Sequence, residues 1–343
     1  MKILCVSGYA AWNKVSKGQM PSHHLFGIHE MIDCYVDNEN GEIRGILYDG
    51  GYVDFFIWKS GKNNIIKQVW KLLKLSREYD LIYDQLNRCS IYLGCLKKIG
   101  MLNCSLLTIM HHPPYDIQLK ISDSDGYIFF DEDYKLLAEK ACLKKKNKYY
   151  VNKWFPDVSW YEKIEQAENN EEEVFFIDNG KSRRDRQILI EASKKSKIRV
   201  DYAGDKNDNE GYARAYCVDL KDDIAMAKRL KKYKAIIVPV LKNEKYKIGP
   251  LGITSFLDCI ALRIPVIASD NVCFAKDIKK YNLGKTYKTG DASSLLAVMQ
   301  EMVSNSEEYG NLKLSMEEYG KERNISKYSK ELKKIITKIL RSE

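Results

Sequence analysis

The stretch that decides the fold is GPLGITSFLDCIALRIPVIASD, residues 249–270. It reads as a glycine-containing loop, a segment with helical periodicity, and a short apolar segment from Pro265 that is typical of a buried strand. Backbone N–H groups at the start of such a helix, with the hydroxyls of Thr254 and Ser255, form an anion site that suits a diphosphate. One helical turn further along the same face, the carboxylate of Asp258 can accept hydrogen bonds from two ribose hydroxyls. Taken alone, the pattern fits a structural helix cap equally well.

Short apolar segments alternate with helical patterns on both sides of this stretch. Strands are predicted at 1–6, 80–83, 105–110, 174–177, 198–203, 235–240 and 265–268. Helices are predicted at 65–75, 185–194, 222–231, 254–262 and 326–340. This rhythm predicts an α/β protein with two doubly wound, Rossmann-like domains that face a cleft.

The pattern breaks around residues 150–172, where aromatic residues give way to an acidic cluster. We therefore expect a first domain at 1–150, a linker at 151–172 and a second domain at 173–325. The lysine-rich segment 326–343 is expected to form a C-terminal helix that packs back on the first domain.

Composition narrows the class of protein. Of the 343 residues, 45% are hydrophobic and 30% charged, which indicates a globular chain with more than one core. No segment approaches the ~20 apolar residues of a membrane-spanning helix, and the nine cysteines lack metal-site spacing, so we expect a cytosolic protein with reduced thiols. The net charge of +9 suggests an acidic partner, but the basic excess is spread over both halves, unlike a nucleic-acid binder.

A basic loop precedes the predicted helix 185–194. Residues 179–185, NGKSRRD, place three cations at the start of this helix, and Asp185 is the expected N-cap. Without the stretch 249–270, a solvated loop would be the favoured interpretation. With it, a functional role for this basic loop is the favoured interpretation.

Residues 249–270 resemble the donor-binding motif of GT-B nucleotide-sugar glycosyltransferases, similar to bacterial capsular and cell-surface polysaccharide enzymes of the glycosyltransferase family four type. The resemblance implies that Asp258 holds the donor ribose, where Glu is usual, and that Lys181 and Arg184 clamp the diphosphate. Many retaining members carry a second Glu where this chain has Pro250.

In the first domain, the candidate residues follow predicted strands. Gly8 ends the first strand and would allow close approach of a phosphate, and residues 22–25 are expected to begin the first helix. In retaining relatives a His-x-Pro contacts the transferred sugar, and both His111 and His112 fit that spacing. An inverting enzyme needs a general base, for which Asp84, His23 and His24 are candidates. The sequence leaves retention and inversion open.

The expected activity is transfer of a hexosyl residue from a nucleoside diphosphate sugar, UDP-linked, to a glycan or lipid-linked acceptor in cell-surface polysaccharide synthesis. The predicted catalytic candidates are His111, His112, Asp84 and His24. The predicted donor-binding residues are Gly8, Lys181, Arg184, Gly252, Thr254, Ser255 and Asp258.

We expect no cofactor other than the sugar nucleotide. We also expect no metal, because the Asp-x-Asp sequence of Asp123 and Asp125 precedes a predicted strand instead of following one, which suggests a solvated loop. Residues 65–75 with Lys62, Lys67, Lys71 and Lys74 form a basic amphipathic pattern that suits peripheral contact with an anionic inner membrane face. The favoured interpretation is that this helix packs on its own sheet and that its lysines reach solvent.

Three alternatives stay open at this point. A nucleotide-sugar epimerase would use the same architecture without an acceptor cleft. A nucleic-acid-binding protein is supported only by the charge. A donor-binding relative without activity is suggested by Pro250.

Overall fold

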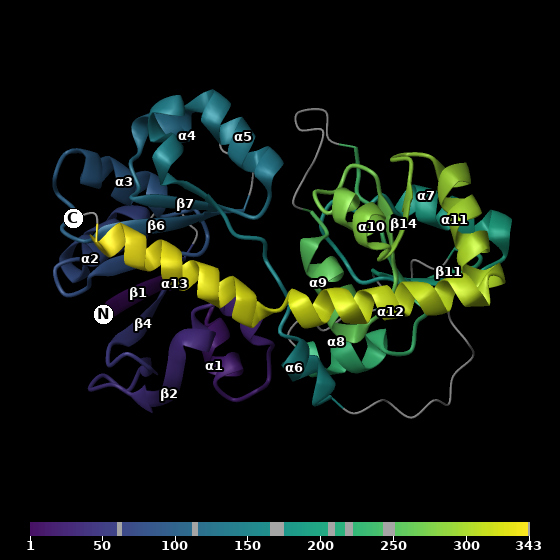
Figure 1. Ribbon diagram of the computed structural model, residues 1–343, viewed down its shortest axis with the longest axis horizontal. Coiled ribbons are helices and arrows are strands. Elements are labelled where there is room, and N and C mark those ends of the chain that lie inside the picture. The colour runs from purple at the N-terminus through teal and green to yellow at the C-terminus, as the bar shows by residue number, and fades with distance from the viewer. Residues whose placement is uncertain are drawn as a thin grey trace. The chain divides into compact units, whose positions relative to one another are not determined.

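The computed structural model describes residues 1–59, 64–111, 116–164, 175–204, 210–216, 222–242 and 251–341. The chain forms two compact units, Met1–Phe155 with Ile325–Glu343, and Pro156–Asn324. Each unit carries one β-sheet with helices against it (Figure 1). The break at Phe155 falls inside the segment where the sequence pattern changes.

The first unit contains a sheet with the strand order β2-β3-β4-β1-β5-β6-β7-β8. In this order, neighbouring strands from β4 through β1 to β8 pair in parallel. At the other end, β2 pairs antiparallel with β3 and β3 pairs antiparallel with β4, so β2 and β3 form an antiparallel edge. The strands are β1 (Lys2–Ser7), β2 (Ile32–Asp37), β3 (Ile43–Leu47), β4 (Tyr52–Ile57), β5 (Leu81–Asp84), β6 (Ser105–Met110), β7 (Gly126–Phe129) and β8 (Tyr149–Val151). Strands buried on both faces explain why the segments of β1, β5 and β6 read as continuous apolar runs.

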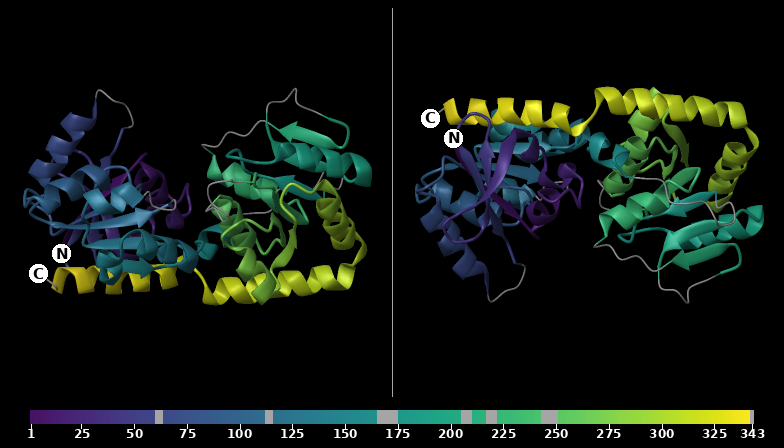
Figure 2. Two further views of the ribbon diagram at one scale, coloured as in Figure 1. Left: turned by 90° about the horizontal axis from the view of Figure 1, so that it is seen from above. Right: turned by 90° about the horizontal axis from the view of Figure 1, so that it is seen from below.

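Helices cover the faces of this sheet. They are α1 (Ala11–Val15), α2 (Ile65–Leu75), α3 (Ser90–Lys98), α4 (Asp116–Ile121), α5 (Glu132–Ala141) and α13 (Ile325–Arg341), with 3-10 turns η1 (Ser22–Leu25), η2 (His29–Met31) and η4 (Leu143–Lys148). Figures 1 and 2 show α13 lying along this unit. Its contact is tight at Gly126, where a Cβ atom would lie 2.6 Å from Cδ1 of Ile339.

The expected start of the first helix at residues 22–25 is wrong. Ser22–Leu25 is an isolated 3-10 turn, and the first α-helix is the earlier α1. The turn cannot continue as a helix because Phe26 and Gly27 have φ angles of 47° and 78°. Gly27 also lies against Tyr328, whose Cδ1 would be 2.6 Å from an added Cβ.

The expected solvated loop at residues 123–125 is also wrong. Asp125 Oδ2 accepts a hydrogen bond from the Leu106 N–H at 2.7 Å and pairs with Lys97 at 2.9 Å. Asp123 Oδ1 lies 3.0 Å from Nζ of Lys148. The two carboxylates thus fix the loop before β7, Asp125 to β6 and α3 and Asp123 to η4.

The second unit contains a fully parallel sheet with the strand order β11-β10-β9-β12-β13-β14. In chain order this is 3-2-1-4-5-6, the order of a Rossmann fold. The strands are β9 (Phe176–Asp178), β10 (Val200–Ala203), β11 (Ala213–Tyr216), β12 (Ala235–Val238), β13 (Val266–Ser269) and β14 (Gly284–Tyr287). The helices are α6 (Val158–Glu162), α7 (Arg186–Ser196), α8 (Asp223–Leu230), α9 (Ile253–Leu262), α10 (Ala275–Tyr281), α11 (Ala292–Ser304) and α12 (Ser306–Glu322).

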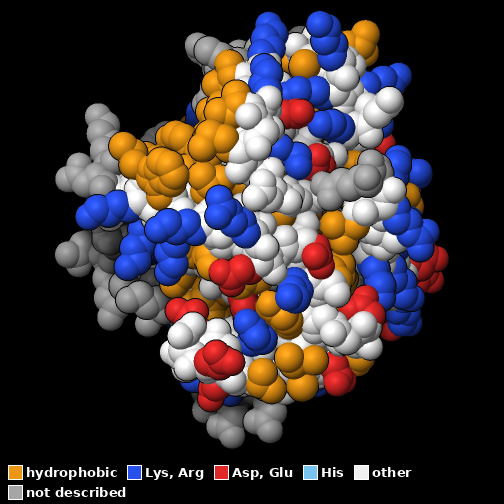
Figure 3. Space-filling view, turned by 90° about the vertical axis from the view of Figure 1, so that its left-hand side faces the viewer, with side chains coloured by type: hydrophobic (Ala, Val, Ile, Leu, Met, Phe, Trp, Pro, Cys, Tyr) orange, Lys and Arg blue, Asp and Glu red, His pale blue; other side chains and the backbone are white. Residues whose placement is uncertain are grey.

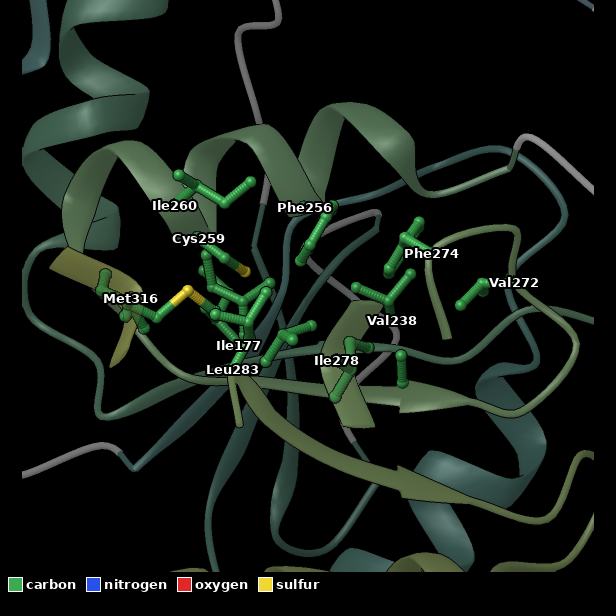
Figure 4. Close-up of a cluster of buried hydrophobic side chains, with 14 of the residues drawn as sticks. Ile177, Val238, Phe256, Cys259, Ile260, Val272, Phe274, Ile278, Leu283 and Met316 are labelled. Atoms are coloured by element: carbon green, nitrogen blue, oxygen red, sulfur yellow. The ribbon is translucent and has the colours of Figure 1, made fainter. Parts of the chain in front are cut away.

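Helix α9 is fixed by its apolar face. Phe256, Cys259 and Ile260 are buried in one cluster with Ile177 of β9 and Val238 of β12 (Figure 4). Their i, i+3, i+4 spacing turns this side of α9 onto the sheet. The polar residues on the rest of the helix therefore have fixed positions relative to the ends of β9 and β12.

Among the residues that the structure describes, no helix is long and apolar enough to cross a membrane.

Candidate donor site

The candidate site lies where the strand order of the second unit reverses, between β9 and β12. Ligands of doubly wound folds bind at such a point, beyond the carboxyl ends of the strands. The loops after the two strands are tied together, because the Asp185 N–H donates to Pro239 O at 2.6 Å and the Leu241 N–H donates to Arg183 O at 3.0 Å. Asp185 then caps α7, as predicted.

Arg184 is a buried cation held at the N-terminal turn of α9. Its Nε donates to Oδ1 of Asp178 at 3.0 Å and its Nη2 donates to Oγ of Ser255 at 2.9 Å. The side chain is 4% exposed and that of Asp178 is fully buried. Burial raises the pKa of Asp178, and the charge of Arg184 opposes the shift. Within the described residues, Nη1 of Arg184 has no hydrogen-bond partner.

Two glycines make room for this guanidinium. A Cβ atom at Gly180 would lie 2.0 Å from Nη2 of Arg184, and one at Gly252 would lie 3.3 Å from Nη1. Gly252 is also the N-cap of α9 with a φ of 84°, and its Cβ would lie 2.3 Å from Val238. Glycine is therefore required at 252 by both conformation and space.

Lys181 and Thr254 are exposed beside the buried pair. Lys181 follows Gly180 in the loop after β9 and makes no ion pair or hydrogen bond to any described residue. Thr254 lies in the first turn of α9, next to Ser255. The predicted diphosphate residues thus divide into a fixed interior part, Arg184 with Ser255, and an accessible part, Lys181 with Thr254.

Asp258 is oriented by two neutral donors. Its Oδ1 accepts from the Tyr161 hydroxyl at 2.6 Å, and its Oδ2 accepts from Nδ2 of Asn179 at 2.7 Å. Burial raises the pKa of this carboxyl to about 7, while the two hydrogen bonds lower it. Arg263, the nearest cation further along the same segment, pairs with Glu162 at 2.8 Å and not with Asp258.

Sequence reasoning missed three residues of this site: Asp178, Asn179 and Tyr161. Asp178 ends β9, and Asn179 opens the loop that had been singled out. Tyr161 comes from α6, 97 residues before Asp258 in the chain. A weak signal existed, since polar residues directly after a parallel strand face the ligand edge of the sheet.

The arrangement offers complementary chemistry. A buried guanidinium and the N-terminal end of α9 attract an anion of phosphate type, and the carboxylate of Asp258 accepts from neighbouring hydroxyls. Oδ2 of Asp178 and Oδ1 of Asn179 are buried without a hydrogen-bond partner. No group of three or more His, Cys, Asp or Glu side chains suited to a metal ion occurs in the described ranges.

In the first unit, His111 lies at the carboxyl end of a strand, whereas His24 lies in the 3-10 turn η1. Nε2 of His111, after β6, lies 2.5 Å from the carbonyl oxygen of Gln85 after β5. A carbonyl only accepts, so Nε2 carries the proton and Nδ1 is the acceptor in the neutral ring. The ring contacts Phe26 and Phe130 edge-on, with centroids 5.1 and 5.4 Å away.

His24 belongs to a second part of this aromatic cluster. Its Nδ1 lies 3.4 Å from the hydroxyl of Tyr9, the residue after Gly8. The neighbouring His23 is buried, and burial followed by the charge of His24 lowers its pKa. Trp154 packs against both rings and donates from Nε1 to the carbonyl of His23 at 2.9 Å.

Asp84 has a different setting. Its side chain is fully buried and accepts from the N–H groups of Leu86 at 3.0 Å and Ser90 at 2.9 Å. Burial raises its pKa. The carboxyl thus shapes the turn after β5 and the start of α3, and the geometry favours His24 over Asp84 as a group that meets a substrate. His112 and Pro250 lie outside the described residues.

The whole chain is similar in structure to several solved proteins. HepE of Anabaena, solved with UDP and glucose, has a TM-score of 0.69 at 12% identity, and the match covers 98% of this chain and 100% of HepE. A glycosyltransferase from Rickettsia africae has a TM-score of 0.70 at 12% identity, covering 100% and 99% of the two chains. Sucrose-phosphate synthase from Thermosynechococcus elongatus has a TM-score of 0.69 at 10% identity, and both chains are covered completely.

No family model and no curated protein matches the sequence. At these identities the structural similarity shows the fold, which is the two-domain, Rossmann-like architecture of GT-B proteins. The fold class predicted from the sequence is thereby confirmed.

Proposed function

We propose that this chain is a glycosyltransferase that transfers a hexosyl residue from a UDP-linked sugar to a glycan or lipid-linked acceptor in cell-surface polysaccharide synthesis. One observation carries the proposal: Arg184, held against the first turn of α9, and Asp258, one turn further along that helix, are each fixed by two hydrogen bonds. A cation at a helix N-terminus suits a diphosphate, and a carboxylate beyond it suits the ribose.

In this proposal the donor lies across the N-terminal part of α9. Arg184 and Lys181 neutralise the diphosphate, and the hydroxyls of Thr254 and Ser255 complete the phosphate site. Charge builds up on the leaving nucleotide as the glycosidic bond breaks, so cations already in place lower the barrier. No cofactor and no metal takes part.

The first unit has the role of acceptor domain in this proposal. Gly8 and His111 directly follow the strands β1 and β6, and His24 lies in the turn η1, next to Tyr9. His111, whose Nε2 is bound to Gln85, is the candidate for contact with the transferred sugar. His24 is the candidate base if the reaction inverts the anomeric centre. Both stereochemical outcomes remain open.

A panel of nucleoside diphosphate sugars, assayed for nucleotide release with and without glycan acceptors, tests the activity. We expect acceptor-dependent release of UDP that persists with EDTA. An epimerase would instead interconvert the sugars without releasing nucleotide. Binding to random oligonucleotides with a steep salt dependence, and no nucleotide-sugar binding, would favour a nucleic-acid binder.

Related chemistry in HepE supports the choice of UDP, since that protein was solved with UDP-glucose as well as with UDP. Membership in the glycosyltransferase family four type, and a cytosolic location at the inner membrane face, belong to the same proposal. The donor screen decides the nucleotide, and product analysis by NMR decides retention or inversion.

A further inference from the structure

A large groove lies on the antiparallel side of the first unit. Residues of helix α1, the hairpin formed by β2 and β3, strand β4 and helix α2 line it. Its volume is about 1270 Å³, which exceeds the ~300–1,000 Å³ that is typical of sites for small molecules. The groove therefore has room for a ligand longer than a single sugar or nucleotide.

Helix α2 supplies one wall of this groove. The predicted packing of the helix on its own sheet is confirmed, because its apolar residues pack in the core of the first unit: Ile65, Val69, Leu72 and Leu73. Lys67 and Lys71 line the groove, and the ammonium of Lys71 lies 5.4 Å from the centre of the Phe56 ring. Lys62 lies outside the described residues. Two lysines of the basic amphipathic pattern thus belong to the groove wall.

Both walls are fixed to β4 and the residues that follow it. On α2, the side-chain amide of Gln68 accepts from the Lys59 N–H at 2.7 Å and donates to the Lys59 carbonyl at 2.9 Å. On β3, Arg44 donates to both oxygens of Asp54 at 2.7 and 2.6 Å, and the Tyr79 hydroxyl donates to the same carboxylate at 2.6 Å. Asp54 is only 8% exposed. The groove is therefore shaped in advance, which lowers the cost of ordering it around a ligand.

Strand β4 turns backbone groups toward the groove. The N–H groups of Tyr52 and Trp58 donate to carbonyls of the β1 segment. Backbone groups of the alternate residues Phe55 and Ile57 therefore point to the opposite side. On that side the pairing of β3 with β4 ends at Val53, so both residues lie beyond the paired part. Alternating N–H donors and carbonyl acceptors can bind a row of hydroxyl groups.

Aromatic rings lie beside this strand. Trp12 of α1 stacks on Phe55 with ring centroids 4.7 Å apart, and both residues line the groove. Phe56 and Tyr79 line it as well. A pyranose ring has an apolar face of C–H groups and a rim of hydroxyls, so it can use aromatic and polar neighbours at the same time.

The charge in the groove is nearly balanced. Its described lining residues include five cationic and four acidic side chains, and Arg44 and Asp54 form an ion pair. Figure 3 faces the end of the first unit that carries α2 and β2, and it shows cationic, acidic and hydrophobic side chains side by side. A nucleic acid or an anionic lipid surface would be matched by an excess of cations. The lining instead favours a neutral polymer that is rich in hydroxyl groups.

The groove has a direction within the first unit. Ala10 lines one end, and it follows Gly8 and Tyr9 at the carboxyl end of β1. Glu78 and Tyr79 line the other end, before the start of the neighbouring parallel strand β5. The groove thus runs from the edge of the sheet that carries Gly8 to the opposite edge.

We propose that this groove binds the glycan chain of the acceptor, several sugars away from the end that reacts. The chain enters beside Gly8 and lies along β4 between α2 and the hairpin. This deepens the proposed function, on which it rests for the identity of the glycan as an acceptor. Binding of the glycan to the groove needs no donor, and its affinity increases with chain length until the groove is filled.

Glycan binding without any nucleotide sugar tests the proposal on the full chain. The probes are an array of neutral oligosaccharides of glucose, galactose, mannose and N-acetylglucosamine, in matched lengths of two and six sugars. We expect at least one hexasaccharide to bind about tenfold or more tightly than its disaccharide in calorimetric titrations. Hydrogen exchange of the segment 52–58 should slow when this hexasaccharide binds, because its sugars cover the edge of β4.

A first variant tests the hairpin wall. Nε and Nη2 of Arg44 bind Asp54, and Nη1 makes no hydrogen bond within the described part of the chain. Arg44→Lys keeps a cation beside Asp54 but lacks the planar fork, so hexasaccharide binding should weaken about fivefold. Arg214→Lys is the matched control in the second unit. Arg214 binds both oxygens of Asp201 at 3.0 and 2.9 Å, and Tyr233 donates to that carboxylate.

A second variant obstructs the groove. Asn13 of α1 is exposed and lines the end near Gly8, so Asn13→Trp should weaken hexasaccharide binding by about tenfold or more. Asn103→Trp makes the same change at an exposed asparagine that does not line the groove, and it should bind like wild type. Melting curves show whether each variant keeps its fold. UDP affinity should be unchanged in all four variants.

Three results would overturn the proposal. The first is that no hexasaccharide binds wild type more tightly than its disaccharide. The second is that Arg44→Lys and Asn13→Trp bind the hexasaccharide as tightly as their controls. The third is binding of heparin or random oligonucleotides in place of neutral glycans, which would indicate a surface for anions. UDP titrations keep the two proposals apart, because a chain that binds UDP and no glycan contradicts the groove alone.

Discussion

Asp258 shows how burial and hydrogen bonding compete at one carboxyl group. Burial raises its pKa to about 7, and the donors Tyr161 and Asn179 limit the rise. The carboxyl therefore changes charge near neutral pH. Only the ionised form offers acceptor oxygens to both hydroxyls of a ribose.

We predict that affinity for UDP-glucose falls as the pH decreases from 8 to 6. The donor's diphosphate does not titrate in this range, so the change reports on the protein. Asp258→Asn should lower affinity at pH 8 by about tenfold, or ~1.4 kcal/mol, and should flatten the pH dependence. Calorimetric titrations of both proteins at pH 6, 7 and 8 give the comparison. An unchanged pH profile in the variant would exclude Asp258 as its source.

The same pKa has a consequence for stability with the opposite sign. Because the folded-state pKa lies above the unfolded value, the protonated carboxyl contributes stability that is complete below the unfolded pKa. This contribution is lost as the pH rises through about 7. Ligand affinity and stability at this residue thus favour opposite ends of the same pH range.

A second prediction concerns Tyr161, whose hydroxyl stabilises the ionised form of Asp258. Tyr161→Phe should raise the pKa of Asp258 and move the midpoint of the affinity profile to higher pH, while affinity at high pH changes little. Tyr212→Phe, at an exposed tyrosine, is the matched control. A uniform loss of affinity at every pH would instead indicate that Tyr161 acts on packing alone.

At the scale of elements, the loop between β9 and α7 fixes the position of the Arg184 guanidinium. Gly180 has an ordinary backbone conformation, so its lack of a side chain matters only for space. Gly180→Ala should push Arg184 away from Asp178 and Ser255. We predict a loss of UDP affinity of about tenfold and unchanged affinity for uridine, which lacks the diphosphate.

Controls separate the loop from the charge it carries. Gly310→Ala places a Cβ where no atom lies within 4 Å, and it should leave binding unchanged. Lys181→Ala removes an exposed cation, so UDP affinity should fall by ~1.5–3 kcal/mol with no change in Tm. Gly180→Ala should lower Tm as well, because it leaves Asp178 buried without its cation. Equal Tm values for the two variants would contradict the role assigned to the loop.

Elements of this chain are largely predictable from hydrophobic period, and α2 has the predicted bounds Ile65–Leu75. The hydrogen-bond partners of polar side chains could not be predicted from the sequence, because they depend on contacts between distant segments. Tyr161 binds Asp258 from 97 residues away, and the burial of Asp84 follows from the amides of the turn after it. Residues 22–25 lack helical continuation only because Phe26 and Gly27 adopt left-handed φ angles.

At the scale of the whole molecule, the chain leaves the first unit at Phe155, builds the second, and returns at Ile325. The returning α13 is part of the first unit's interior. Tyr328, Leu332, Ile336 and Ile339 are buried, and the Tyr328 carbonyl accepts from Nδ2 of Asn152 at 3.0 Å. The first unit therefore depends on a helix that follows the second unit in the chain, whereas Arg184, Ser255 and Asp258 all lie in Pro156–Asn324.

The last prediction follows from this connectivity. Removing residues 325–343 should unfold the first unit and spare the second. Burial of each large apolar side chain contributes about 1.5–3 kcal/mol, so losing the buried face of α13 removes an amount comparable to the ~5–15 kcal/mol that holds a domain together. Hydrogen exchange on the shortened chain should show loss of protection in β1, β5 and β6 and retention in β9 and β12. Residues 156–324 alone should bind UDP with nearly the affinity of the full chain. A chain that joins 1–155 to 325–343 through a flexible linker should recover the protection of β1 and β6. Protection of these strands without α13 would show that the helix is an accessory to the first unit instead of part of its core.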